Sequence, residues 1–369
     1  MENFGIYVHI PFCVAKCNYC NFASKYASNE EIDRYIAFLC KEIKQKSSIL
    51  KNKLATSIYI GGGTPSFVDS KHIVRIIEII RNNYNVLQGA EITIECNPCS
   101  TTKQKLQDYK NAGINRISFG VQSLNDNELE IIGRKHTAKM AKEAILEAKE
   151  VGYENISADL LIGIPEQTNE SLLNNIQQLI NLGVKHISAY MLILEEGTQL
   201  YNQVSKNMLL CASEDESVNM YNNAYSLLKN LGYERYEISN FAKKGYESKH
   251  NVNYWELGEY IGFGVSAHSF YNGKRIANSN TFNGYYKGIQ DVELLSNEET
   301  IEEIIMLGLR QEKGVSISKL YEYGYDILKK RYEQIDILIK NNLIKIENDY
   351  IKIMPDKFGL TSAIILELI

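Results

Sequence analysis

The sequence has no apolar run long enough to cross a membrane and no recognisable secretion signal. None of its apolar stretches approaches the roughly 18 residues that a bilayer-spanning helix needs. The first residues, MENFGIYVHIPFC, lack the positive region followed by an apolar region that marks a signal peptide. We therefore expect a cytoplasmic protein, for which peripheral membrane association is left open.

The sequence also lacks a basic excess and a disulfide framework. There are 40 Lys and Arg against 45 Asp and Glu, for a net charge of −5. This balance argues against a nucleic-acid binder, which needs a basic surface stripe. The seven cysteines are odd in number and unevenly spread, so they do not form a disulfide framework. In a reducing compartment, clustered cysteines bind metal or do redox chemistry.

What is present is an alternation of short β-type runs with longer amphipathic stretches. Period-two runs that alternate with 3.6-period runs predict βα units and a parallel sheet. Six such units make an incomplete barrel, whose site lies at the carboxyl ends of the strands. The expected strands are 6–10, 57–63, 91–98, 116–123, 156–165 and 187–193, and the clearest helical patterns are 29–46, 70–84, 137–153, 169–183 and 213–231.

Two further regions follow the expected barrel, which occupies residues 1–232. Residues 233–294 are rich in loops and aromatics, and we interpret them as a small linking module. Residues 295–369 return to helical patterns, and 344–353, IKIENDYIKI, is typical of a β-hairpin. Helices followed by a hairpin predict a winged-helix-like end domain. Its thirteen Asp and Glu against ten Lys and Arg do not favour DNA binding.

The stretch CVAKCNYCNFA places Cys13, Cys17 and Cys20 within eight positions. Three thiolates at this spacing can converge on zinc or on an iron–sulfur cluster. A structural zinc needs a fourth Cys or His, and none follows at a standard short spacing. A [4Fe–4S] cluster on three cysteines leaves one iron open for a small molecule. Structural zinc and three incidental cysteines are the alternatives.

The CxxxCxxC pattern, with Tyr19 before its third cysteine, resembles the signature of the radical S-adenosylmethionine (SAM) superfamily. The surrounding YVHIPFCVAKCNYCNF is similar to the coproporphyrinogen III dehydrogenase-like branch, and the resemblance extends from Tyr7 into the last domain. It implies a partial (βα)6 TIM-like barrel that holds one [4Fe–4S] cluster and SAM. It also implies that Cys13, Cys17 and Cys20 are the cluster ligands.

Polar and glycine-rich residues follow successive strands of the expected barrel. In isolation each has a structural explanation: GGGTP (61–65) as a tight turn, and Glu95 as a solvated rim carboxylate. Together they stand where a barrel gathers ligand contacts. The resemblance implies SAM contacts at Tyr7, Tyr19, Gly62, Gly63, Thr64, Glu95, Gln122, Arg134 and Asp159.

The chain departs from the family pattern at Cys99 and Glu166, where glycine is common. Cys96 and Cys99 thereby form a second CxxC. Two cysteines alone make a poor metal site, so we expect free thiols near the top of the barrel.

Phe22 stands where the dehydrogenase itself has a fourth cysteine, and only twelve residues precede Cys13. Both features resemble the HemW-type branch, as does HNVNYW (250–255). A neutral imidazole can ligate heme iron, and Tyr and Trp offer flat apolar area. A capped histidine and a core tryptophan are the structural alternative. The resemblance implies heme-binding residues His250, Asn251, Tyr254 and Trp255.

The resemblance thus implies a heme chaperone with heme as cargo, acceptor hemoproteins as partners and an electron donor for the cluster. The alternative is an enzyme, either an oxygen-independent coproporphyrinogen III dehydrogenase or another radical SAM enzyme acting on a tetrapyrrole. The intact cluster and SAM motifs leave catalysis open, although Phe22 disfavours the dehydrogenase.

Overall fold

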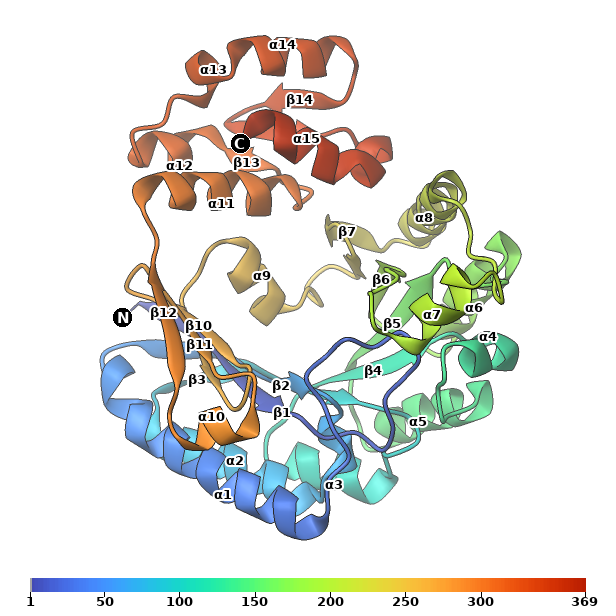
Figure 1. The fold of residues 1–369 in the computed structure, drawn as a ribbon, viewed down its shortest axis with the longest axis vertical. Helices are drawn as coiled ribbons and strands as arrows, with labels where there is room; N and C mark the ends of the chain where they lie inside the picture. Colours follow the sequence, from blue (N-terminus) through green and yellow to red (C-terminus); the bar gives the residue numbers. More distant parts are fainter. Residues whose placement is uncertain (1) are drawn as a thin grey trace.

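The computed structural model describes residues 2–369, and its centre is a curved parallel sheet of six strands (Figure 1). The strands are hydrogen-bonded in chain order, and all six were predicted from the sequence. They are β1 (Asn3–Ile10), β2 (Leu54–Gly62), β3 (Val86–Cys96), β4 (Arg116–Gln122), β5 (Asn155–Ile162) and β6 (His186–Met191). Because they are parallel, their carboxyl ends meet at one edge of the sheet.

Helices cover the outer face of this sheet (Figure 1). They include every helix that the periodicity predicted. Along the chain these are α1 (Asn29–Lys46), α2 (Ser70–Asn83), α3 (Lys103–Asn111), α4 (Asp126–Ile131), α5 (Ala138–Glu150), α6 (Asn169–Asn181), α7 (Gln199–Ser205) and α8 (Glu214–Asn230), with short 3-10 turns at Ser47–Leu50 and Pro65–Phe67.

Helix α1 illustrates how the local sequence specifies these elements. Ser28 caps its N-terminus through the backbone of Glu31, and the Glu31 side chain returns to the Ser28 backbone, so two otherwise unpaired amides are satisfied. Ile32, Ile36 and Ile43 then fall on one face and are buried. The apolar stripe packs on the sheet and leaves the charged face outward.

The strands of residues 233–294 extend the barrel sheet. They pair at both edges of the sheet: β9 lies beside β1 and β8 lies beside β6. The partial barrel is not closed, so each edge strand presents unpaired backbone groups that another strand can satisfy. The elements are β7 (Glu234–Glu237), β8 (Asn240–Ala242), α9 (Lys249–Trp255), β9 (Tyr260–Phe263), β10 (His268–Tyr271), β11 (Lys274–Asn278), α10 (Phe282–Tyr286) and β12 (Gln290–Leu294).

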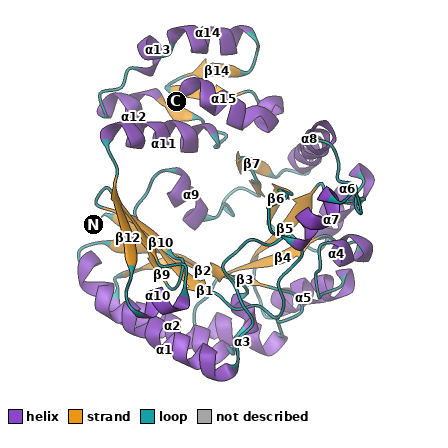
Figure 2. Cartoon of the chain, viewed as in Figure 1, coloured by secondary structure: helices purple, strands orange, loops and turns teal. Residues whose placement is uncertain are grey.

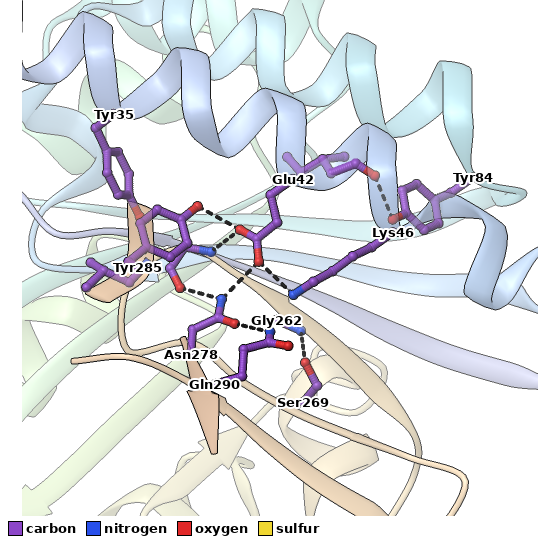
Figure 3. Close-up of polar contacts among 12 residues, drawn as sticks. Tyr35, Glu42, Lys46, Tyr84, Gly262, Ser269, Asn278, Tyr285 and Gln290 are labelled. Carbon is purple, nitrogen blue, oxygen red and sulfur yellow. Dashed lines mark hydrogen bonds and ion pairs between the residues drawn. The ribbon is translucent and has the colours of Figure 1, made fainter. Parts of the chain in front are cut away.

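A buried carboxylate joins this extension to the barrel. Glu42 of α1 accepts hydrogen bonds from Asn278 Nδ2 at 2.9 Å and from the Tyr285 hydroxyl at 2.7 Å, and it also accepts the Gly264 amide at 3.0 Å (Figure 3). Lys46 balances its charge at 2.7 Å. A buried charge that is paired and fully hydrogen-bonded is tolerated, so the network fixes β9–β11 against α1.

The C-terminal segment forms helices around a small antiparallel sheet of order β13-β15-β14 (Figure 2). The hairpin predicted at 344–353 is confirmed as β14 and β15, and the arrangement is the expected helical, winged-helix-like one. The elements are α11 (Asn297–Leu309), β13 (Val315–Ser316), α12 (Ile317–Glu322), α13 (Ile327–Lys330), α14 (Tyr332–Lys340), β14 (Ile344–Glu347), β15 (Tyr350–Ile353), a 3-10 turn (Pro355–Leu360) and α15 (Thr361–Leu368).

The domain limits 1–232, 233–294 and 295–369 stay a prediction. Among residues 2–369, no helix combines the length and the apolar character that crossing a bilayer requires.

Candidate cluster and cofactor site

The cysteine loop lies over the carboxyl end of the barrel. It is anchored at Asn18, whose backbone and side-chain amides donate to Ile132 O at 3.0 Å and Ile131 O at 2.9 Å. The Asn18 carbonyl in turn accepts from Leu200 N at 2.8 Å. Cys13, Cys17 and Cys20 are free, half-buried thiols that line one cavity of about 410 Å³.

The three thiols share this cavity but have not converged on a point. Across residues 2–369, no three His, Cys, Asp or Glu side chains are already disposed to hold a metal ion. Burial raises the pKa of Cys20, and the neighbouring thiols of Cys17 and Cys13 raise it as well. Cationic iron would relieve this cost because it binds the thiolate form. The donor set therefore fits an iron–sulfur cluster chemically.

The glycine loop after β2 brings backbone close to the first cysteine. A Cβ added to Gly63 would lie 3.0 Å from Cys13 Sγ and 2.9 Å from Phe12 O, so a side chain there would fill the cradle. Gly62 has a φ of 118°, which favours glycine. Thr64 Oγ1 lies 3.3 Å from Cys13 Sγ. The loop is therefore built for close approach rather than for a simple turn.

Two half-buried carboxyl groups face the same cavity from β3 and β5. Glu95 accepts hydrogen bonds from the Tyr59 hydroxyl at 2.8 Å and from Gly62 N at 3.1 Å. Burial raises the pKa of Glu95 to about 7, with a smaller contribution from Asp159. Burial also raises the pKa of Asp159, which accepts from Ser118 Oγ at 3.3 Å. The nearby Arg116 lowers both pKa values, but burial outweighs it. The sulfonium and ammonium groups of SAM would add positive charge beside these carboxyl groups.

Gln122 and Arg134 complete the wall beyond β4. Gln122 has a φ of 66° at a register shift between β4 and β5, so the strand bends where its side chain enters the cavity. Arg134 donates to the Gly120 carbonyl and to Cys17 Sγ, the latter at 3.5 Å. Its buried Nε has no partner among the described residues. An orphaned donor beside the cysteines indicates a site built for a further acceptor.

The structure therefore brings together eight of the nine residues predicted to contact SAM, since all of them except Tyr7 line this cavity. Tyr7 lies one layer deeper in the barrel. Its hydroxyl is 2.9 Å from His9 Nδ1, and its ring stacks on Tyr59 at 6.3 Å between centroids. The Tyr7 side chain lies behind the cavity wall, and a SAM contact at Tyr7 stays a prediction.

The HNVNYW motif forms helix α9 on the inner side of the curved sheet (Figure 1). Residues 250–255 do not line this cavity. His250 is only 1% exposed. Its Nδ1 is 2.9 Å from Ser57 Oγ and its Nε2 is 2.8 Å from the Tyr254 hydroxyl. Burial, together with the Arg116 guanidinium, lowers the pKa of His250 to about 3, so the ring is neutral. Neither nitrogen is open in this conformation.

The rest of the motif ties the barrel to the C-terminal helices. Gln311, which follows α11, donates to the Trp255 carbonyl at 2.9 Å. Asn251 and Trp255 are half-buried, and the ring of Tyr254 meets that of Tyr260 edge-on at 4.4 Å. Heme ligation by this motif stays a prediction, and its observed contacts are those of a packed structural element.

Sequence comparison agrees with this geometry. The radical SAM superfamily model matches residues 7–179, and the HemN C-terminal domain model matches 295–355. The chain is 35% identical over 360 residues to "Heme chaperone HemW" of Lactococcus lactis, which covers 96% of this chain and 94% of that protein. The chain belongs to the HemW family.

Other relatives also match over most of the chain. "Heme chaperone HemW" of Bacillus subtilis is 37% identical over 86% of each chain. A mitochondrial "Radical S-adenosyl methionine domain-containing protein 1" of Danio rerio is 33% identical over 85% of this chain and 74% of its own. Among solved structures, coproporphyrinogen III oxidase (HemN) from Escherichia coli superposes with a TM-score of 0.85 over 100% of this chain and 90% of that one. At 20% identity that likeness shows the shared fold.

Several cavity residues of this HemW-family chain escaped sequence analysis. Tyr190 ends β6, and its position at the last barrel strand was the signal that could have identified it. Asn97 lies in the NPCS turn after β3 and was not singled out, whereas Cys96 and Cys99 were expected there only as free thiols, and both are free. Lys16 and Lys135 flank motif residues and had no pattern of their own. All of these line the cavity.

Proposed function

We propose that this chain is a heme chaperone that holds a [4Fe–4S] cluster, binds SAM, and binds and delivers heme to acceptor hemoproteins. The observation that carries the proposal is one cavity lined by the three cysteines of one loop, the glycine loop after β2 and the strand-end residues Glu95 and Asp159. The names of its relatives in Lactococcus and Bacillus support the chaperone role.

Each group at the cavity has a part in this proposal. Cys13, Cys17 and Cys20 hold the cluster, which when bound supplies the single electron that radical SAM chemistry requires. Glu95 and Asp159 receive the cationic groups of SAM, and the Gly62–Gly63 backbone makes room for it. Arg134, beside Cys17, offers its free Nε to an acceptor on the bound molecule. An electron donor and a cytoplasmic location belong to the same proposal.

The heme site is the least constrained part of the proposal. His250 has both ring nitrogens occupied, so axial ligation requires the ring to leave Ser57 or Tyr254. Tyr254 and Trp255 would then offer aromatic area beside it. The proposal thus makes heme binding at α9 dependent on a local rearrangement.

The test is an anaerobic assay of reconstituted protein, in which a heme titration is run beside coproporphyrinogen III with SAM and a reductant. We expect a Soret band that saturates with heme and no formation of protoporphyrinogen. Wild-type protein that binds no heme would contradict the chaperone role.

The alternative is a coproporphyrinogen III dehydrogenase or another radical SAM enzyme that acts on a tetrapyrrole. The HemN-type C-terminal domain and the shared fold favour it, although a fold does not decide a reaction. Turnover of coproporphyrinogen III in the same assay would establish this alternative and displace the first.

A further inference from the structure

Five thiols line the cavity of the cysteine loop, and the half-exposed one outside the loop is Cys99. It lies in the turn that follows β3, where its backbone N donates to Asn97 Oδ1 at 3.1 Å and Ser100 N donates to Asn97 O at 3.0 Å. These bonds hold the turn that presents Cys99. The thiol is free and half-buried, and it lines the same cavity as Cys13, Cys17 and Cys20.

The neighbouring Cys96 differs from Cys99. Cys96 is only 3% exposed, and burial raises its pKa to about 12. It therefore stays a protonated core thiol. Both cysteines of the second CxxC therefore line the cavity, but Cys96 is buried in its wall and Cys99 is half-exposed there.

Arg134 and the motif cysteines share the cavity with Cys99. Burial raises the pKa of the Cys99 thiol, Arg134 lowers it, and the nearby Cys17 and Cys13 raise it. Arg134 also donates to Cys17 Sγ at 3.5 Å, and its buried Nε has no partner among the described residues. Apart from the buried Cys96, four thiols and a cation thus line one cavity, and four is the number of thiolates that can hold a [4Fe–4S] cluster.

We infer that Cys99 is a fourth protein ligand for the cluster and closes, when SAM is absent, the position that the three motif cysteines leave open. The inference rests on the cluster of the proposed function. Cys99 loses its proton when its sulfur binds, and it regains a proton when SAM takes the position. No electrons are exchanged.

This arrangement makes Cys99 and SAM competitors for one position. The apparent affinity for SAM is the intrinsic affinity multiplied by the fraction of molecules in which the position is open. If Cys99 is bound in about nine of ten molecules, removing it tightens SAM binding roughly tenfold. A closed position also shields the cluster from water and oxidants until SAM arrives.

The experiment compares anaerobically reconstituted wild type with Cys99→Ser and Cys99→Ala, and Cys211→Ser serves as the control. Cys211 is a half-buried thiol that lines a different cavity. Iron content and circular dichroism establish that each variant folds and carries the cluster. The readouts are the electron paramagnetic resonance spectrum of the reduced cluster, with and without SAM, and the SAM dissociation constant.

We expect both Cys99 variants to keep about four irons per chain, to change the spectrum recorded without SAM, and to match wild type once SAM is saturating. The SAM dissociation constant should fall roughly tenfold in Cys99→Ala and stay unchanged in Cys211→Ser. If the SAM-free spectrum or the dissociation constant of Cys99→Ala equals that of wild type, the inference is overturned. A wild-type chain that assembles no four-iron cluster would overturn the proposed function as well.

Discussion

The cysteine loop and helix α9 each carry a motif of candidate ligands, and they lie in opposite environments. In the loop, the thiols are half-buried, line a cavity and adjoin the unpaired Nε of Arg134. In α9, His250 is buried, stacked on Tyr59 at 5.1 Å and hydrogen-bonded at both nitrogens. The cysteine loop thus adjoins a polar group without a hydrogen-bond partner, whereas both ring nitrogens of His250 in α9 are already hydrogen-bonded.

A motif identifies candidate residues, but it does not show whether their polar groups lack hydrogen-bond partners. A buried polar group without a partner is costly, so an orphan beside a cavity indicates an expected ligand. A buried group with all partners in place stabilises the fold. The contrast predicts cofactor loss from changes in the loop and fold instability from changes in α9.

The largest effect is expected from the cysteine loop. Replacing Cys20 by Ala should abolish the cluster, because the position that Cys20 holds then has no thiolate and Cys99 is inferred to take a different one. Anaerobic reconstitution should give about four irons per wild-type chain and a brown chromophore, and the variant should give neither. A full [4Fe–4S] cluster in Cys20→Ala would show that the ligand assignment is wrong.

The second effect concerns α9. His250→Ala removes two hydrogen bonds and a packed ring, so the free energy of unfolding should fall by about 3 kcal/mol. Urea unfolding measures the change, and His268→Ala is the matched control because His268 is exposed. A loss below about 0.5 kcal/mol, the usual range of surface changes, would remove the structural role.

The same variant also tests the heme prediction. At equal concentrations of folded protein, His250→Ala should shift the Soret band or weaken heme binding, because a ligating imidazole would be lost. An identical spectrum with equal affinity would leave heme delivery standing and exclude His250 as the axial ligand.

A third, smaller effect concerns the carboxylates of the cavity. Asp159→Ala should weaken SAM binding by about 10- to 100-fold, the worth of one charge-assisted hydrogen bond, while the iron content stays unchanged. Calorimetry on the reconstituted protein gives the affinity. Glu154→Ala is the control, since that carboxylate is exposed just before β5. Equal affinities for both variants would place Asp159 outside the SAM site.

A fourth effect follows from the Glu95 pKa of about 7. The ionised carboxylate is the form that attracts a cationic ligand, so SAM binding should weaken as the pH falls. Between pH 8 and pH 6 the loss should be roughly tenfold, because the ionised fraction changes by about that factor. In Glu95→Gln this dependence should flatten. A wild-type profile as flat as that of the variant would contradict the role of Glu95.

The smallest effect is expected at Phe22, which is 69% exposed at the edge of the loop. Phe22→Cys should leave cluster content unchanged, because three ligands are already present, and should create no activity on coproporphyrinogen III. The assay is protoporphyrinogen formation under reducing conditions with SAM. New turnover in this variant would mean that a single residue separates the two functions.

Sequence patterns predict the six βα units, the C-terminal hairpin and most of the cavity wall. Apolar residues recur every two positions in a strand and every 3.6 positions in a helix, because one face of each element is buried. The order of apolar and polar residues in the sequence therefore indicates the type of element. Parallel strands bring their carboxyl ends together, so Glu95, Gln122 and Asp159 could be assigned to one site before any coordinates.

Which candidate side chains are exposed and lack hydrogen-bond partners depends on contacts that form only in the folded chain. Residues 233–294 were expected as a separate module, but the unclosed sheet recruits their strands to both of its edges. The neighbours Cys96 and Cys99 look alike in sequence and both line the cavity, yet Cys96 is buried and Cys99 is half-exposed. His250 has both nitrogens satisfied by groups distant in the chain or one helical turn away. Burial and hydrogen-bond partners come from segments that meet only on folding, so no local pattern records them.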